Sequence, residues 1–259
     1  VRGGTLSDTL RRLLQAIFFQ VHVAQRRIIE HWQLEQAALG LEHPDVLKGI
    51  RERAMADAFE AFDGPPDVGH YVEVLEGKCA GKRGVINSFE YGECIVLCLD
   101  STASDRLQPH QLRSSGLDET RFLTQAMALR CDDIHTACTQ LSQVMHDALD
   151  EVRRLVTHDE LPLLSMLQAE PLLLQSSHLS FQEYFAATAL CEDGAQLFGA
   201  PPWQWPAWWA NTVTFGEGMG DAFNRGLLHA TGVEGDTLNL CEKLRGHRQT
   251  VLRVAVLFM

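Results

Sequence analysis

Residues 178–187 read HLSFQEYFAA and carry the signals of a helix that begins near their third residue. Ser180 can accept hydrogen bonds from the first free backbone N–H groups of a helix. Glu183, three residues further on, can reach back to complete a capping box. Leu179, just before the cap, can pack on Tyr184 as a hydrophobic staple. The sequence therefore predicts a helix here, with a buried face made of Phe181, Phe185 and Ala189.

Upstream of this stretch, residues 117–156 keep a helical period. One apolar stripe runs through them from Phe122 to Val156, at the spacing of a single helix face. The sequence therefore predicts one long helix over 117–156. Pro162 and Pro171 bracket a short connecting element between that helix and the HLSFQEYFAA stretch.

The amino-terminal part of the chain is also helical in pattern. Apolar residues recur at helical spacing from Leu6 to Val21, and again from Leu47 to Phe62. The His-Pro-Asp step at 43–45 separates the two runs, and the sequence DGPP at 63–66 stops the second one. We therefore expect two helices over residues 5–62.

Residues 67–113 change to short β-type runs separated by glycine turns, which predicts a small, strongly bent barrel. The stretch VEVLEGKCAGKRGVI at 72–86 resembles KOW-type and related SH3-like barrels. Lys78, Lys82 and Arg83 at its turn leave RNA binding open as an alternative. Because residues 67–115 hold 5 basic and 7 acidic side chains, a protein-binding or structural role is favoured over contact with phosphates.

The predicted fold is mainly α-helical with one small inserted β-barrel, an α+β arrangement in which a helical bundle or winged-helix remnant follows the barrel. The expected regions are an N-terminal helical region at 1–64, an SH3- or KOW-like barrel at 65–115, a long helix with a winged-helix-like remnant at 116–178, and a helical region at 179–259.

The stretch at 178–187 also closely resembles a motif of NACHT proteins, the STAND-type family that includes the NOD-like receptors, over ten consecutive positions. In that family the motif lies where the winged-helix domain passes into the second helical domain. The resemblance extends over residues 155–232, since an aromatic-rich segment is followed by a helical pattern with an apolar residue every four positions. This pattern comprises Phe215, Met219, Phe223 and Leu227.

The resemblance implies a role for His178. In the family, the histidine at this position contacts the terminal phosphate of bound ADP and helps to hold the closed state. His178 is therefore the candidate sensor of a nucleotide phosphate. The alternative is that its ring pairs with a backbone carbonyl at the edge of the winged-helix region.

A nucleotide-hydrolysing site is not expected in this segment. The nearest string to a P-loop, GKCAGKR at 77–83, is one residue short and has Arg83 where serine or threonine is required. No Ser–His–Asp, Cys–His or paired-carboxylate motif is present either. We therefore expect no enzyme and no cofactor in this segment, with ADP or ATP bound elsewhere in a parent protein.

Two further clusters have a structural and a functional interpretation. Trp203, Trp205, Trp208 and Trp209 are candidates for a partner surface, since aromatic residues anchor interfaces, or for a cap on the helical core. Cys131, His135 and Cys138 share a helix face at i, i+4 and i+7 and could bind zinc. A fourth ligand is not evident, and cysteine is a common core residue, so we expect no metal site.

Composition narrows the remaining possibilities. The formal net charge of −12 makes nucleic acid an unlikely partner. No apolar run reaches the roughly 18 to 20 residues that span a bilayer. The seven scattered cysteines form no CxxC pair, which favours reduced thiols and a cytoplasmic location. Both ends of the chain look cut, as in an internal stretch of a longer protein.

Together these observations predict a non-catalytic regulatory region of a NACHT/STAND-type signalling protein. It would relay nucleotide state to a downstream repeat array, of leucine-rich or WD type, and contact protein partners or neighbouring domains. The alternatives are a barrel-centred module that binds RNA or a ribonucleoprotein, and a structural adaptor without nucleotide control.

Overall fold

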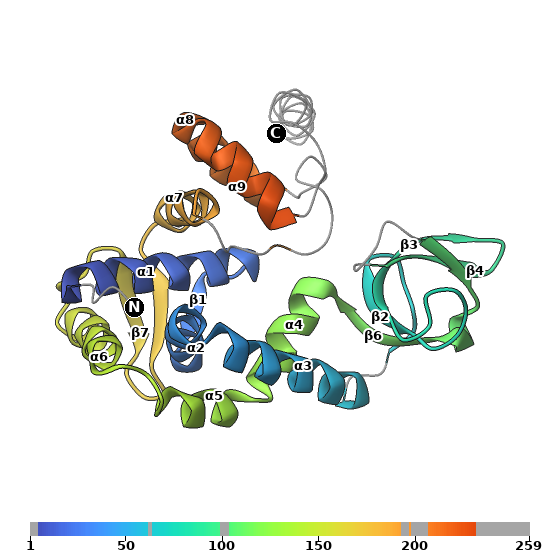
Figure 1. Ribbon diagram of the computed structural model, residues 1–259, viewed down its shortest axis with the longest axis horizontal. Helices are drawn as coiled ribbons and strands as arrows, with labels where there is room; N and C mark the ends of the chain where they lie inside the picture. Colours follow the sequence, from blue (N-terminus) through green and yellow to red (C-terminus); the bar gives the residue numbers. More distant parts are fainter. Residues whose placement is uncertain (1–4, 62–63, 99–103, 193–196, 198–206, 232–259) are drawn as a thin grey trace. The chain divides into compact units, whose positions relative to one another are not determined.

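The computed structural model of the chain describes residues 5–61, 64–98, 104–192, 197 and 207–231. Over these residues it contains nine α-helices and two antiparallel sheets, of three and five strands. The chain divides into two compact units (Figure 1). The first unit comprises residues 1–42 and 141–259, and the second comprises residues 43–140, so the second is inserted into the first.

The first unit begins with a helix, a short strand and a second helix. These are α1 (Leu6–Val23), β1 (Ile28–Glu30) and α2 (His31–Glu42). After the inserted unit, the first unit resumes with α6 (Gln143–Thr157), β7 (Leu164–Gln168) and β8 (Leu173–Ser176). The three strands form an antiparallel sheet in the order β1-β8-β7, in which Ile29 lies opposite Leu174. Parts of the chain separated by more than a hundred residues thus share one sheet.

Three helices complete the first unit: α7 (Leu179–Leu190), α8 (Ala210–Met219) and α9 (Asp221–Thr231), with a 3-10 turn, η3 (Ala207–Trp209), before α8. Helix α7 packs on α1, on α8 and on α9, as Figure 1 shows. The rings of Phe18 and Phe185 stack at 5.1 Å between α1 and α7. A Cβ atom at Gly226 of α9 would lie 1.5 Å from the carbonyl oxygen of Leu190, so only glycine allows this approach.

The inserted unit combines three helices with the five-stranded sheet. The helices are α3 (Pro44–Ala61), α4 (Glu119–Ala128) and α5 (Cys131–Cys138). The strands are β2 (His70–Val74), β3 (Arg83–Glu90), β4 (Glu93–Cys98), β5 (Ser104–Leu107) and β6 (Leu112–Asp118), with the 3-10 turn η1 (Pro109–Gln111) between the last two.

Two groups of side chains form the core of the inserted unit. The sheet buries one apolar cluster, and an aromatic trio joins β2 to the helices. In that trio, ring centroids lie 5.7 Å apart for Phe59 and Tyr71 and 4.8 Å apart for Tyr71 and Phe122. The cluster consists of Val72, Val74, Cys79, Ile86, Cys94, Val96, Leu107 and Leu112.

The expectation of a mainly helical chain with a small closed barrel is wrong. The five strands form an open sheet in the order β5-β4-β3-β2-β6, and the fold is a mixture of helices with two sheets. Within the described residues, β5 pairs only with β4, and β6 pairs only with β2. The η1 turn leads directly from one edge strand to the other, and Pro109 at its start has no N–H to donate to a ladder. Strong bending of the sheet was predicted, and Figure 1 shows it.

The single long helix expected over 117–156 is also wrong. Its apolar stripe is divided among α4, α5 and α6. Each of α4 and α6 starts at a side chain that caps it: Asp118 Oδ1 accepts from the N–H of Arg121 at 2.9 Å, and Ser142 Oγ accepts from the N–H of Met145 at 3.3 Å. Helical periodicity continues through these breaks because all three helices turn an apolar face inward. The region before residue 62 likewise contains α1, α2 and α3 rather than two helices.

In each unit, hydrogen bonds join the two chain segments at which the insertion begins and ends. In the first unit, the carboxylate of Glu42 accepts from the N–H of Ser142 at 2.8 Å and from its hydroxyl at 2.6 Å. In the inserted unit, Nε2 of His43 lies 3.0 Å from the carbonyl oxygen of Gln140. The insertion therefore enters and leaves at one place, a geometry that disturbs the host fold little.

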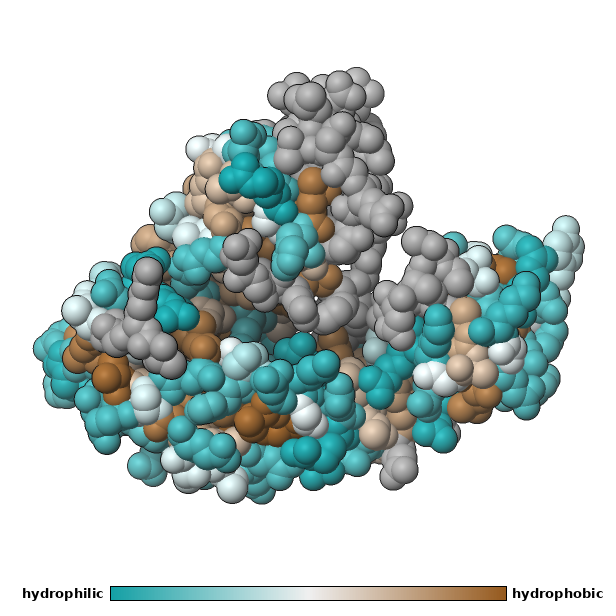
Figure 2. Space-filling model, in the orientation of Figure 1, coloured by the Kyte–Doolittle hydropathy of each residue, from teal (hydrophilic) through white to brown (hydrophobic). Residues whose placement is uncertain are grey.

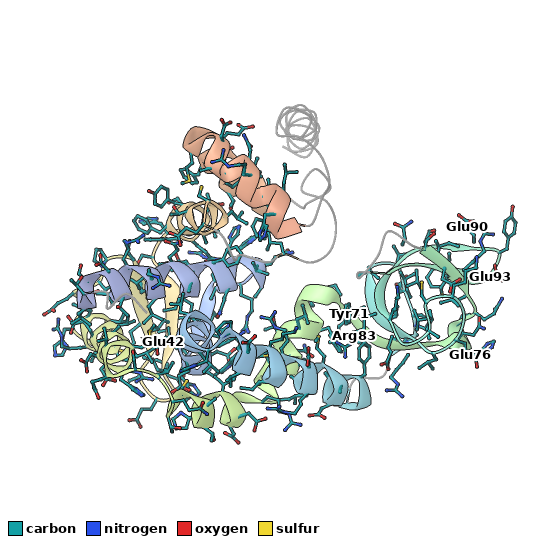
Figure 3. The ribbon with its side chains drawn as sticks, in the orientation of Figure 1. Glu42, Tyr71, Glu76, Arg83, Glu90 and Glu93 are labelled. Carbon is teal, nitrogen blue, oxygen red and sulfur yellow. The ribbon has the colours of Figure 1, made fainter. Side chains whose placement is uncertain are left out.

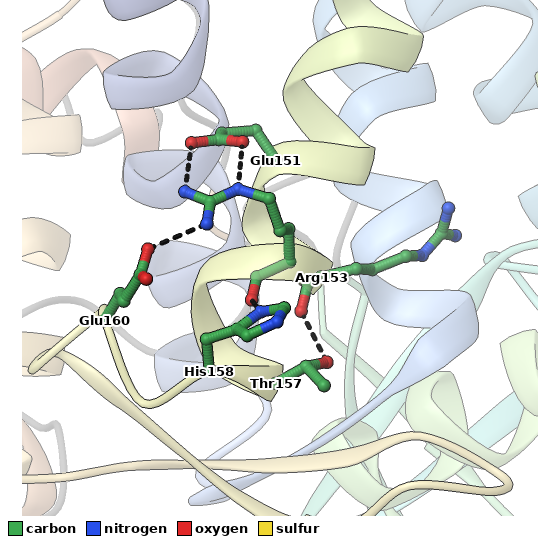
Figure 4. A network of polar contacts seen from close by, with 6 residues as sticks. Glu151, Arg153, Thr157, His158 and Glu160 are labelled. Carbon is green, nitrogen blue, oxygen red and sulfur yellow. Dashed lines mark hydrogen bonds and ion pairs between the residues drawn. The ribbon is translucent and has the colours of Figure 1, made fainter.

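A polar network fixes the carboxyl end of α6 before the β7–β8 hairpin (Figure 4). Arg154 makes a two-pronged pair with Glu151, at 2.8 and 2.9 Å, and a third bond to Glu160 at 2.8 Å. Hydrogen bonding to Arg154 lowers the pKa of Glu151. His158, the C-cap of α6, has its Nδ1 2.8 Å from the carbonyl oxygen of Arg154. This contact occupies one of the last carbonyl groups of the helix. None of the helices in the described ranges is both long and apolar enough to cross a membrane.

Candidate functional site

His178 stands at the amino-terminal end of α7 with an exposed ring. Its backbone is extended, with φ −134° and ψ 136°, and its carbonyl oxygen accepts from Ser176 Oγ at 2.7 Å and from the N–H of Phe181 at 3.1 Å. The ring meets the edge of the Phe181 ring at 5.8 Å. Within the described part of the chain, the imidazole makes no hydrogen bond to a carbonyl group. The structure therefore leaves this ring accessible to a ligand.

The capping box expected at Ser180 and Glu183 is wrong. Helix α7 begins at Leu179 with His178 as its N-cap, so Ser180 already lies in the first turn. Glu183 turns inward instead and is 3% exposed. Its Oε1 accepts from Asn211 Nδ2 at 3.1 Å, which joins α7 to α8. Burial raises the pKa of Glu183, and the bond from Asn211 partly offsets this shift.

The face of α7 that is buried also differs from the expected one. The expected set, Phe181, Phe185 and Ala189, is only half-buried. Gln182 is fully buried instead, and its Nε2 donates to the carbonyl oxygen of Arg26 at 2.8 Å, just beyond the end of α1. Its Oε1 is buried and has no hydrogen-bond partner among the described residues. The residues of α7 that are buried are Gln182, Glu183, Ala186, Ala187 and Leu190.

A buried histidine, His22, makes a further polar contact to α8. The sequence did not single it out. His22 on α1 is fully buried, and its Nε2 lies 2.8 Å from the hydroxyl of Thr212 on α8. Its Nδ1 is buried and meets no hydrogen-bonding group in the part of the chain that the structure describes. Burial lowers the pKa of His22 to about 3, because the charged imidazolium would lose its hydration. In sequence, His22 stands in an ordinary apolar helix pattern, and nothing local distinguishes it from a surface residue.

Two of the four candidate tryptophans surround His22. The Trp208 ring stacks on the imidazole at 5.3 Å, and the Trp209 ring meets it edge-on at 4.5 Å. Trp208 Nε1 also donates to the carbonyl oxygen of His22 at 2.9 Å. Trp209 is 6% exposed, so these two side chains pack inward on the core. Trp203 and Trp205 lie outside the described residues.

We call this set of contacts the polar junction. It runs from Glu183 through Asn211 and Thr212 to His22, with Gln182 bonded beside it to the end of α1. A displacement of α7 must therefore break or remake hydrogen bonds to the turn that follows α1 and to α8. Buried polar contacts of this kind favour discrete arrangements over gradual ones, since each unpaired group costs about 1 to 3 kcal/mol. The junction can transmit a change in the position of α7 to the elements around it.

The string at 77–83 that imitates a P-loop lies between two strands of the inserted unit and does not lead into a helix. Asp105 occupies this loop, because its Oδ2 accepts from the N–H of Cys79 at 3.1 Å. A carboxylate at that place repels a phosphate instead of leaving room for it.

Two arginines on the sheet of the inserted unit are paired with carboxylates. Arg106 pairs with Glu90 at 2.7 Å, and Arg113 pairs with Glu73 at 3.3 Å. These pairs neutralise the cations that an RNA backbone would need.

The three residues considered as zinc ligands lie on α5. Cys138 is buried, whereas Cys131 is half-exposed with its Sγ 3.9 Å from Asp132. Over the residues that the structure describes, no three histidine, cysteine, aspartate or glutamate side chains gather closely enough to hold a metal ion.

The chain was compared with protein-family models, curated proteins and solved structures. No protein-family model, no curated protein and no solved structure matches the chain.

Proposed function

We propose that this chain is a regulatory segment of a NACHT/STAND-type signalling protein, in which helix α7 relays the state of a bound nucleotide to the helices that follow it. The observation that carries the proposal is the contrast along one helix. His178 at its start is exposed, whereas Gln182 and Glu183, one turn later, are buried and bond to Arg26, in the turn after α1, and to Asn211 of α8. A phosphate that binds His178 therefore acts on a helix whose next turn is bonded to two other parts of the first unit.

The topology of the first unit supports the same resemblance. Its elements follow the order α1, β1, α2, α6, β7, β8, with a three-stranded sheet in the order β1-β8-β7 and a terminal hairpin. This is the order of a winged helix, interrupted between its second and third helices by the inserted unit. The winged-helix-like part therefore starts at α1, well before residue 116, and ends where the HLSFQEYFAA stretch begins.

The exposure of His178 favours the relay over a plain adaptor. An imidazole that only supported its own domain would be bonded to a nearby carbonyl group, and this one is not within the described residues. The paired arginines of the inserted sheet likewise give no support to a nucleic-acid function.

The proposal is tested by a thermal-unfolding titration of the chain with ADP and ATP, with and without magnesium. Tryptophan fluorescence is the readout, because all five tryptophans lie in the first unit. A nucleotide present at 100 times its Kd is expected to stabilise the folded state by about 2.7 kcal/mol. His178→Ala should abolish this stabilisation, and His31→Ala, which removes another exposed histidine of the same unit, should leave it unchanged. Absence of any stabilisation, or equal stabilisation of the His178→Ala variant, would contradict the proposal.

A further inference from the structure

The hairpin between β3 and β4 ends in an exposed aromatic side chain. Tyr91 and Gly92 form its two-residue turn, with φ values of 53° and 85°, and Glu90 pairs with Glu93 as the last rung of the ladder. Such turns need positive φ at both positions, which favours Asn, Asp or Gly. Tyrosine is a costly choice there, since a bulky side chain rarely adopts positive φ.

Tyr91 also has no packing role in the described structure. It is 99% exposed, the highest value among the large apolar and aromatic side chains, and Phe89, two residues before it, is 40% exposed. Figure 2 shows the visible side of this unit as largely hydrophilic, with hydrophobic side chains only in small groups. Two aromatic side chains at a hairpin end are therefore a local feature of the surface, of the kind that anchors protein interfaces.

The charges around the hairpin indicate the partner. Glu90 and Glu93 lie at the free end of the hairpin and Glu76 lies at the rim of the same sheet (Figure 3). Glu93 accepts from the amide of Gln108 at 3.2 Å and Glu76 accepts from the amide of Gln111 at 3.2 Å. Amide donors hold a carboxylate in place without neutralising it. The whole inserted unit, residues 43–140, has 10 lysines and arginines against 16 aspartates and glutamates, a net charge of −6.

We infer that the end of the β3–β4 hairpin, residues 89–93, is a docking surface for an arginine- or lysine-bearing segment of a protein partner. The Tyr91 ring offers its face to a cation, and the carboxylate of Glu93 accepts hydrogen bonds from the same or the next basic side chain. Glu90 is paired with Arg106, which largely neutralises it, so Glu93 is the carboxylate offered to the partner. The inference is independent of the proposed nucleotide relay, because it concerns the other unit.

The test uses the full chain and a fluorescently labelled (Gly-Arg)4 peptide, followed by fluorescence anisotropy in 150 mM salt, where non-specific attraction is screened. The same peptide with citrulline in place of arginine keeps the shape and removes the charge. The arginine peptide is expected to bind and the citrulline peptide is not. Tyr91→Asn should weaken binding by about two- to fivefold, the range of an exposed cation–π contact, and Tyr91→Phe should retain it.

A second pair of variants controls for net charge. Glu93→Gln and Glu52→Gln remove one exposed or half-exposed carboxylate each from the same unit, and only the first should weaken peptide binding. Binding that does not differ between the two, or between wild type and Tyr91→Asn, would overturn the inference. The inference would also be overturned if the arginine peptide did not bind at all. It would be overturned too if a U-rich RNA oligonucleotide bound instead and Tyr91→Asn abolished that binding.

The thermal stability of the Tyr91→Asn variant distinguishes a binding role for Tyr91 from a structural one. Because asparagine tolerates positive φ better than tyrosine, Tyr91→Asn should raise the midpoint of thermal unfolding, by about 2 °C, while it weakens peptide binding. A lower midpoint would mean that Tyr91 supports the fold and would overturn the inference.

Discussion

The two units of this chain bury different kinds of side chain. In the inserted unit, the buried cluster of the sheet is entirely apolar, and among the residues that the structure describes there, the only buried polar side chains are Ser114 and Ser115. The first unit buries many more polar groups, and several of them connect different helices. They are Gln15, His22, Gln33, Glu35, Gln36, Ser176, Gln182, Glu183, Thr212 and Asn224.

This difference bears on what each unit can do. An apolar cluster tolerates small shifts, since its contacts are non-directional and weaken gradually. A buried hydrogen bond is either made or lost, and losing it leaves an unpaired group. A relay requires two discrete arrangements of the same helices, so the proposed relay belongs to the first unit. The inserted unit is suited to hold a surface, such as the β3–β4 hairpin, in a fixed shape.

Spectroscopy can follow the two units separately. All five tryptophans lie in the first unit, whereas two of the three tyrosines, Tyr71 and Tyr91, lie in the inserted unit. Tryptophan fluorescence therefore reports the first unit alone, and circular dichroism reports both. The predictions for Gly226, Ile86 and His22 use this separation.

The largest effect is expected from Gly226→Ala in the first unit. The new Cβ would lie 1.5 Å from the carbonyl oxygen of Leu190, and because this atom belongs to the backbone, α7 and α9 must separate. The expected loss is about 3 kcal/mol or more, measured by urea unfolding with tryptophan fluorescence. Gly218→Ala is the control, because its Cβ meets nothing within 4 Å; it should stabilise α8 by up to about 1 kcal/mol. Equal stabilities of the two variants would contradict the packing of α9 on α7.

The next effect is expected from Ile86→Ala in the inserted unit. Ile86 is 1% exposed within the apolar cluster, and its truncation should cost about 2 to 3 kcal/mol, toward the lower part of the range for such changes. Circular dichroism should show part of the unfolding transition at a lower urea concentration, while the tryptophan transition remains in place. If both signals shift together, the units unfold as one, and the contrast between them does not extend to their stability.

Sequence reasoning predicted the regular elements of this fold better than their connections. The strands at residues 70–98 were found because glycine turns separate β-branched runs. The closed barrel was wrong, since closure depends on whether two edge strands meet, and no local pattern records that. The long helix was wrong because an apolar stripe continues across α4, α5 and α6, although Asp118 and Ser142 are recognisable caps. The split of the first unit between α2 and α6 leaves no sign in the local sequence pattern.

The role of His178 as a nucleotide sensor stays a prediction. His178 was selected from a resemblance, and the structure adds that its ring is exposed. The sequence favoured a capping role for Glu183, because a serine three residues earlier satisfies the local rule; tertiary contact with Asn211 prevailed instead. His22 was missed entirely. Its role depends on Thr212 and Trp208, which lie more than 180 residues further along the chain.

An intermediate effect is expected from pH, through His22 in the first unit. The pKa of His22 is lowered to about 3 in the folded state, against about 6.5 when unfolded. Above pH 6.5 both states are neutral and the full stability is present. Below it the unfolded state binds a proton that the folded state does not, so stability falls by about 1.4 kcal/mol per pH unit toward pH 3. Between pH 6.5 and 5 the loss is about 2 kcal/mol.

The measurement is the free energy of unfolding from tryptophan fluorescence at several pH values, compared with the variant His22→Gln. The difference between the two proteins isolates His22, because Glu183, whose raised pKa acts in the opposite direction, is common to both. The groups that contact His22, namely Thr212, Trp208 and Trp209, do not titrate in this range. Parallel pH profiles of wild type and variant would show that the imidazole is hydrated in the folded state.

The smallest effects are expected from two ion pairs that differ in burial. In the first unit, Arg153 bonds to Glu35 at 3.4 Å, and the Glu35 side chain is 7% exposed. In the inserted unit, Arg106 bonds to Glu90 at 2.7 Å, but both side chains are about half exposed, at 55% and 45%. Distance alone would make the second pair the stronger one. Solvent reverses this order, because an exposed pair is screened and both side chains lose entropy when they are held together.

Arg153→Ala removes a cation from beside a buried carboxylate, and the expected cost is about 1 kcal/mol, below that of a fully buried pair because the arginine itself is partly exposed. Arg106→Ala should cost less than about 0.5 kcal/mol. Urea unfolding in 50 mM and 500 mM salt distinguishes the two, since salt should erase the effect of Arg106→Ala and leave most of that of Arg153→Ala. If Arg106→Ala lowers the free energy of unfolding more than Arg153→Ala does, then the hairpin end depends on the Arg106–Glu90 pair for its shape. Polar contacts that fix the structure would then not be confined to the first unit.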